Sequence, residues 1–155
     1  MIAWLKLSLL SLILLMYTIR QISSWNVGNY LHEVDAAVIK LLDKPINKNK
    51  RKLFEAINDY IETLQDLIEK INLKRRTALA AAEVLLVQEA PQYSSKAIDD
   101  KKLCDKFGWD EIDVDDIHRL MNETCSMWAE FKVAYRELKV YFSAEDKKKR
   151  DYSEY

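Results

Sequence analysis

The sequence predicts an all-α protein in which an N-terminal transmembrane helix precedes an antiparallel helical bundle, or coiled-coil hairpin, of about three helices. The chain of 155 residues contains only two glycines and two prolines, too few for the many tight turns of a sheet-rich fold. Residues 1–19 form an almost uninterrupted apolar run, and a second apolar pattern further along repeats with the 3-4 spacing of a coiled coil. The length fits one domain.

Residues 1–20 are expected to form a transmembrane signal anchor. Lys6 is the only charged side chain before Arg20. At ~1.5 Å per residue, a helix of this length nearly covers the ~30 Å hydrocarbon core of a bilayer. Tyr17, Arg20 and Trp25 lie at the end of the run or just beyond it, where interfacial anchors belong. We therefore predict a single-pass membrane protein whose lipid partner is the bilayer itself.

Two other interpretations of the apolar run stay open. It could be a signal peptide that is cleaved near Ser24, although no A-x-A site follows it. It could also be a buried helix that packs against the second apolar run, Ala78–Val87. If the run is an anchor, Lys6 draws its start toward the cytoplasm, which favours a helical body on the non-cytoplasmic side.

The rest of the chain divides into a juxtamembrane hinge at residues 21–28, a helical domain and a charged tail. Pro45 and Pro91 interrupt the helical pattern because proline cannot continue a helix. Gly108 is placed to close a short helix inside the loop between the last two long helices. The predicted helical domain is 29–145, with helices over 29–43, 49–90 and 113–145, a loop over 91–112, and the charged tail over 146–155.

The second and third predicted helices carry the candidate helix–helix interface. Apolar residues repeat there three and four positions apart, which places them on one face of each helix. This face could close inside the chain or could bind a protein partner or a second copy. The candidate interface residues are Phe54, Ile57, Ile61, Leu64, Ile68, Ile71, Ile117, Leu120, Met127, Phe131 and Leu138.

The sequence contains no recognisable catalytic, cofactor or metal motif, so we predict a non-enzymatic protein without a cofactor or small-molecule substrate. His32 precedes Glu33 but lacks the second histidine of an H-E-x-x-H zinc site. The chain has 24 basic and 25 acidic side chains, a balance that gives no support for nucleic-acid binding. Cys104 and Cys125 could form a disulfide in an oxidising compartment, or stay free thiols.

These features predict a membrane-anchored helical interaction or scaffold protein, an accessory or structural component of a membrane-associated complex. The layout of a starting membrane helix, a long helical body, a cysteine-bearing loop and a final amphipathic helix resembles phage inner-membrane spanins. The resemblance is one of architecture, and the apolar run Ala78–Val87 departs from the charged rods of that family. A secreted helical binding domain is the alternative if the apolar run is removed.

Overall fold

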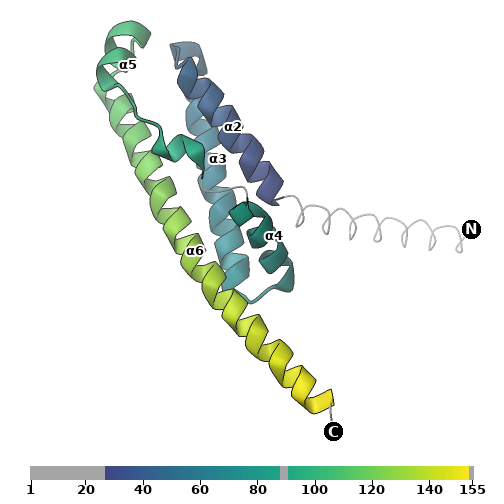
Figure 1. Cartoon of the computed structure of the whole chain (residues 1–155). Coiled ribbons are helices and arrows are strands. Elements are labelled where there is room, and N and C mark those ends of the chain that lie inside the picture. Colours follow the sequence, from purple (N-terminus) through teal and green to yellow (C-terminus); the bar gives the residue numbers. More distant parts are fainter. Residues whose placement is uncertain (1–26, 88–90, 154–155) are drawn as a thin grey trace, which may run out of the picture.

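The computed structural model describes residues 27–87 and 91–153, and this part of the chain is helical without a β-strand (Figure 1). The all-α helical bundle that the sequence predicts is confirmed. The elements are α2 (Val27–Asp43), α3 (Asn47–Asn72), α4 (Arg76–Val87), the short 3-10 helix η1 (Gln92–Ser95), α5 (Asp100–Phe107) and α6 (Glu111–Ser153).

Three long helices form the frame of the bundle. The helices α2 and α3 lie antiparallel, and α6 packs along α3 and continues past the α3–α4 turn (Figure 1). The shorter α4 contacts α2, α3 and α6, and η1 contacts α2 and α6. The helix α5 lies at the start of α6. The core between these elements contains fully buried side chains, among them Leu31, Val38, Leu53, Ile57, Tyr60, Leu64, Ile71, Tyr93, Ile117, Phe131 and Leu138.

The structure has two helices, α3 and α4, where the sequence predicted one helix over residues 49–90. The chain turns at Lys74, which adopts a left-handed backbone with a φ of 56°. Glycine is the usual residue for such a turn, so no sequence signal marked it. The turn lets α4 bury Ala78, Ala82 and Leu85 in the core, which offsets the cost of about 1–3 kcal/mol for a left-handed lysine.

The last helix is longer than predicted, because α6 extends from Glu111 to Ser153 and so includes most of the expected charged tail. The predicted loop over 91–112 contains η1 and α5. Asp99 caps α5 by accepting from the Lys102 backbone N–H at 3.0 Å, and Gly108 ends it with a φ of 70°, the role its position predicted.

The predicted membrane helix, residues 1–20, lies outside the described residues, as does most of the predicted hinge over 21–28. Among the helices of residues 27–87 and 91–153, none is long and apolar enough to cross a bilayer. The last two hinge residues, Val27 and Gly28, are the first residues of α2 and not a break before it.

Gly28 lies where α2 packs closely against α4. A Cβ atom built on Gly28 would lie 2.8 Å from Val84 Cγ1 and 3.1 Å from the backbone nitrogen of Leu85. The first contact is below any normal carbon–carbon distance, and the backbone of α4 cannot step aside without disturbing its own hydrogen bonds. The missing side chain at this position therefore sets the spacing of the two helices.

We expect Gly28→Ala to lower the free energy of unfolding by about 1–2 kcal/mol through overpacking. Alanine is the better helix former, so a loss cannot come from helix propensity. Urea unfolding followed by circular dichroism measures the change, with His32→Ala, an exposed site on the same helix, as the control. Equal or greater stability of Gly28→Ala would show that α2 and α4 are not in close contact.

Candidate functional site

The predicted interface residues lie where α3 meets α6, and the chain covers them itself. Nine of them are buried, with relative exposures of 5% or less, whereas Phe54 and Met127 are partly buried. Phe131 is fully buried beside Trp128, whose ring centroid lies 5.0 Å from its own. This face is therefore occupied within one chain and is not free for a partner or a second copy.

A buried polar cluster joins four elements at the centre of the bundle. Asp35 of α2 is 7% exposed and accepts hydrogen bonds from the backbone N–H groups of Gln92 at 2.9 Å and Tyr93 at 3.0 Å. The Tyr93 hydroxyl lies 2.8 Å from Thr124 Oγ1, which donates to the Leu120 carbonyl oxygen at 2.9 Å. Asp35 thus caps the start of η1 from another helix and ties it to α2.

Tyr60 of α3 completes this cluster. Its ring meets that of Tyr93 edge to face, with centroids 5.4 Å apart. Burial raises the pKa of both phenols well above the ordinary tyrosine value, and the nearby Asp35 carboxylate raises both further. The hydrogen bond to Thr124 acts in the opposite direction on Tyr93 but is outweighed by burial. Both phenols are therefore neutral in the folded protein.

These raised pKa values predict alkaline unfolding. Because the folded pKa lies above the unfolded value of ~10, the contribution of each phenol is fully present below pH ~10 and is lost as the pH rises toward the folded pKa. Each tyrosine should steepen the fall in unfolding free energy by up to about 1.4 kcal/mol per pH unit. Unfolding measured between pH ~8 and ~11.5 should show a shallower fall in the Tyr60→Phe/Tyr93→Phe variant, and an unchanged slope would contradict the assignment.

This cluster was not among the residues predicted from sequence, although weak signals for it exist. Asp35 lies between Leu31 and Val38 at helical spacing, so the apolar stripe of α2 passes directly over it. Thr124 likewise interrupts the apolar stripe of α6. A polar residue inside an apolar stripe indicates a buried partner, but the partner here is the backbone of η1, which no residue type identifies.

Trp109 holds together the end of the bundle where the α2–α3 turn meets α5 and the start of α6. We call this end, residues 43–55 and 96–116, the far end. The Trp109 Nε1 donates to the Pro45 carbonyl oxygen at 2.7 Å, and its ring lies 5.7 Å from that of Phe54. Lys50 and Asp113 form an ion pair beside it, which links α3 to α6. These contacts fix the register of the α3–α6 pair.

A depression of about 390 Å³ lies at this end. Its walls combine apolar and polar residues, and its two carboxylates and two lysines balance in charge, with Asp43 paired to Lys96. The lining residues are Leu42, Asp43, Pro45, Lys96, Ala97, Ile98, Asp99, Lys102, Leu103 and Phe107. The set contains no nucleophile with a neighbouring base, so it offers no arrangement for covalent catalysis.

Cys104 and Cys125 are free thiols in the structure. Cys104 lies half-buried on α5, where burial and the acidic neighbours Asp105 and Glu111 raise the pKa of its thiol. Cys125 is exposed on α6 and lies 3.9 Å from the Ser94 carbonyl oxygen. A raised pKa disfavours the reactive thiolate, so Cys104 lacks the environment of a catalytic cysteine. A bridge between the two stays a prediction for an oxidising compartment.

Two further polar side chains form helix-end and surface contacts. Asp110 Oδ1 accepts from the Asp113 N–H at 2.8 Å and so caps α6. His118 pairs with Asp100 on α5 at 2.7 Å, and both side chains are about half exposed. Within residues 27–87 and 91–153, no group of three His, Cys, Asp or Glu side chains is arranged to hold a metal ion.

The chain matches no protein-family model, no curated protein and no solved structure.

Proposed function

We propose that this chain is a single-pass, membrane-anchored helical interaction protein that serves as an accessory or structural component of a membrane-associated complex. The observation that carries the proposal is the apolar run over residues 1–19, with Lys6 as its only charge, placed directly before a polar helical body. The run supplies the attachment to lipid, and the body supplies a surface for protein contact on the non-cytoplasmic side.

The burial pattern supports an interaction role for the outer surface of α6. The heptad faces of α3 and α6 are occupied by each other, so α3 offers no free apolar face of that width. On the opposite side of α6, Val133 and Val140 are 47% and 70% exposed and lie two helical turns apart on one face. A partner helix that covered both valines would remove apolar surface from water at little cost in ordering.

Membrane extraction followed by intact-mass measurement tests the anchor. We expect the full chain, Met1 to Tyr155, in the membrane fraction, and expect it to resist alkaline carbonate and to require detergent. Release of a chain that begins near Trp25 would favour the secreted binding domain instead. Recovery of the unprocessed chain in buffer without detergent would contradict the proposal.

A photoreactive amino acid at Val140 tests the interaction role in native membranes. We expect it to link the chain to one recurrent partner that is identified by mass spectrometry, because Val140 is exposed on the outer face of α6. The same group at His32, an exposed site on α2, is the control. An equal yield and the same products at both sites would mean that the α6 face has no specific partner.

A further inference from the structure

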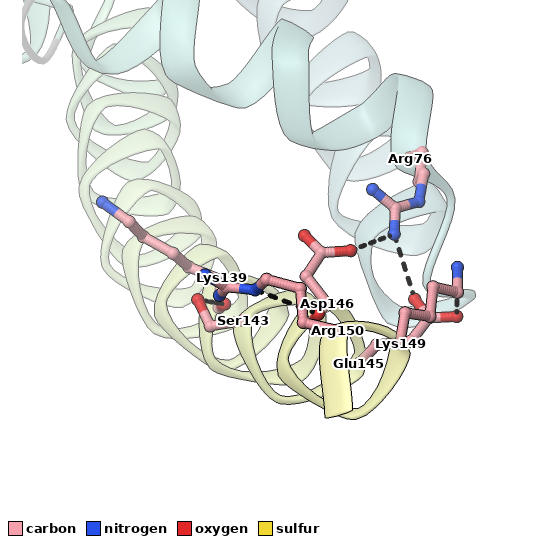
Figure 2. A network of polar contacts seen from close by, with 7 residues as sticks. All are labelled: Arg76, Lys139, Ser143, Glu145, Asp146, Lys149 and Arg150. Carbon is pink, nitrogen blue, oxygen red and sulfur yellow. Dashed lines mark hydrogen bonds and ion pairs between the residues drawn. The ribbon is translucent and has the colours of Figure 1, made fainter. Parts of the chain in front are cut away.

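One end of the bundle brings the α3–α4 turn against the C-terminal part of α6. Arg76, the first residue of α4, donates to Glu145 at 3.2 Å and to Asp146 at 2.9 Å (Figure 2). Its guanidinium carbon also lies 4.6 Å from the centroid of the Phe142 ring. Lys74 lies 5.6 Å from the ring centroid of Tyr141. These contacts hold the two segments together as one surface, which we call the basic end.

The basic end consists of residues 69–76 and 139–152, and it carries a net positive charge. These residues include nine Lys or Arg and four Asp or Glu, in a chain of formal net charge −1. By contrast, the far end, residues 43–55 and 96–116, contains nine basic and ten acidic side chains. The charge of the body is therefore polarised along its long axis.

Two of the four carboxylates of the basic end form ion pairs inside it. Asp146 and Glu145 share Arg76, and Glu145 also pairs with Lys149 at 3.4 Å. The Arg76 guanidinium holds the pKa of the Asp146 carboxyl below its usual value. Of the other cations of the basic end, four make neither an ion pair nor a ring contact with any described residue. They are Lys70, Arg75, Lys147 and Lys148.

Exposed apolar and aromatic side chains accompany these cations. Leu73 projects from the α3–α4 turn with 58% of its surface exposed, and Tyr141 and Tyr152 of α6 are 46% and 84% exposed. No residue from 143 to 152 is buried, so this part of α6 extends beyond the bundle as an arm (Figure 1). Basic side chains beside a leucine and tyrosines are the composition that favours a lipid–water interface.

The start of α2 lies nearer to the basic end than to the far end (Figure 1). Gly28, near the start of α2, touches Val84 and Leu85 of α4, and α4 leads directly back to the α3–α4 turn (Figure 1). The far end, with α5 and the α2–α3 turn, is at the opposite end of α2. An anchor that joins α2 would therefore keep the basic end closer to the membrane than the far end.

We propose that the basic end binds the anionic headgroups of the membrane in which the chain is anchored, an inference that rests on the proposed function. Electrostatic attraction of exposed lysines and arginines to anionic lipid is additive over the cluster and falls within a Debye length. Leu73 and Tyr152 enter the headgroup layer, while the Arg76 contacts keep the α3–α4 turn and the α6 arm at one level. The body then lies tilted onto the membrane surface rather than standing free of it.

Lysine acetylation of the full-length protein in vesicles tests this proposal. The protein is reconstituted in phosphatidylcholine alone or with roughly a third of phosphatidylglycerol, and labelling is quantified by mass spectrometry. We expect Lys74, Lys147 and Lys148 to react at least about fivefold more slowly in the anionic vesicles, relative to Lys48 and Lys101 of the far end. Salt at ~0.5 M should remove the protection.

Two variants and a measurement with duplex DNA serve as controls for this experiment. Lys147→Gln/Lys148→Gln should reduce the protection of Lys74, measured against Lys101, whereas the matched pair Lys48→Gln/Lys52→Gln should leave it unchanged. Equal reactivity of both ends in anionic vesicles would overturn the inference while the anchor still holds the protein in the vesicles. Failure of the protein to float with neutral vesicles would instead overturn the proposed function. Equal protection by duplex DNA at matched charge would overturn the assignment to lipid.

Discussion

Replacing Phe131 with alanine is expected to lower the free energy of unfolding by about 3–5 kcal/mol. Phe131 is fully buried at the contact of α3 with α6, so truncation removes buried apolar surface and leaves a cavity that the two helices cannot close. Small proteins are stable by only about 5–15 kcal/mol, so this single change removes a large share. Urea unfolding of the detergent-solubilised protein, followed by circular dichroism, measures the loss.

Val133→Ala is the matched control for this prediction. Val133 lies two residues further along α6 and is 47% exposed, so its truncation should change the free energy of unfolding by less than about 0.5 kcal/mol. If the two variants lost similar stability, the outward and inward faces of α6 would have been assigned wrongly. A smaller loss in Phe131→Ala alone would mean that α6 does not pack on α3 at this level.

Replacing Asp35 with alanine is expected to cost about 2–5 kcal/mol, the second large effect. The change leaves the partly buried N–H of Gln92 and the buried N–H of Tyr93 without their acceptor, and an orphaned buried donor costs about 1–3 kcal/mol. Amide hydrogen exchange resolves the effect locally. The Gln92 and Tyr93 amides should exchange much faster in Asp35→Ala, while amides at the centre of α3 change only with global stability.

Two variants control for this prediction. Asp35→Asn keeps an acceptor oxygen of the same size and should retain part of the protection at Gln92 and Tyr93. Glu33→Ala removes an exposed carboxylate from the same helix and should leave both amides as they are. Unchanged exchange at the two amides in Asp35→Ala would show that η1 does not depend on the α2 carboxylate.

The parts of the fold that sequence predicts well are those in which apolar spacing repeats over several turns. The stripe from Phe54 to Ile71 and the stripe from Ile117 to Leu138 each mark one helix face, and the structure buries both. Such stripes arise because each helix must hide one side from water, and the pattern is local in sequence. Pro45 marks the first turn for an equally local reason.

The break between α3 and α4 could not be predicted in this way. No glycine or proline lies near Lys74, and the stretch 76–87 by itself is a good helix former. The chain reverses there because α4 then packs against the N-terminal part of α2. The apolar surface buried by this contact depends on where α2 lies in space, which the local sequence does not show. Gly28 shows the same limit, because as a weak helix former it predicted a hinge, whereas close packing against Val84 is what requires it.

The buried polar cluster was beyond sequence reasoning for a further reason. Its members come from α2, α3, η1 and α6, and the hydrogen bonds that join these elements link residues 31 to 58 positions apart. Hydrogen bonds between such distant groups follow from the assembled fold and not from local pattern. The Arg76 contacts with Glu145 and Asp146 at the basic end are of the same kind.

The central claim is that α3 and α6 close on each other within a single chain, so that the partner surface is the outside of the bundle. Zero-length carbodiimide coupling of Lys50 to Asp113, an ion pair between these two helices, tests it directly. The reaction is done on ¹⁵N-labelled and unlabelled chains that have been unfolded together and refolded in detergent. We predict a coupled peptide that is wholly labelled or wholly unlabelled. Peptides with one labelled and one unlabelled half would contradict the account, because α3 would then pair with α6 of another copy.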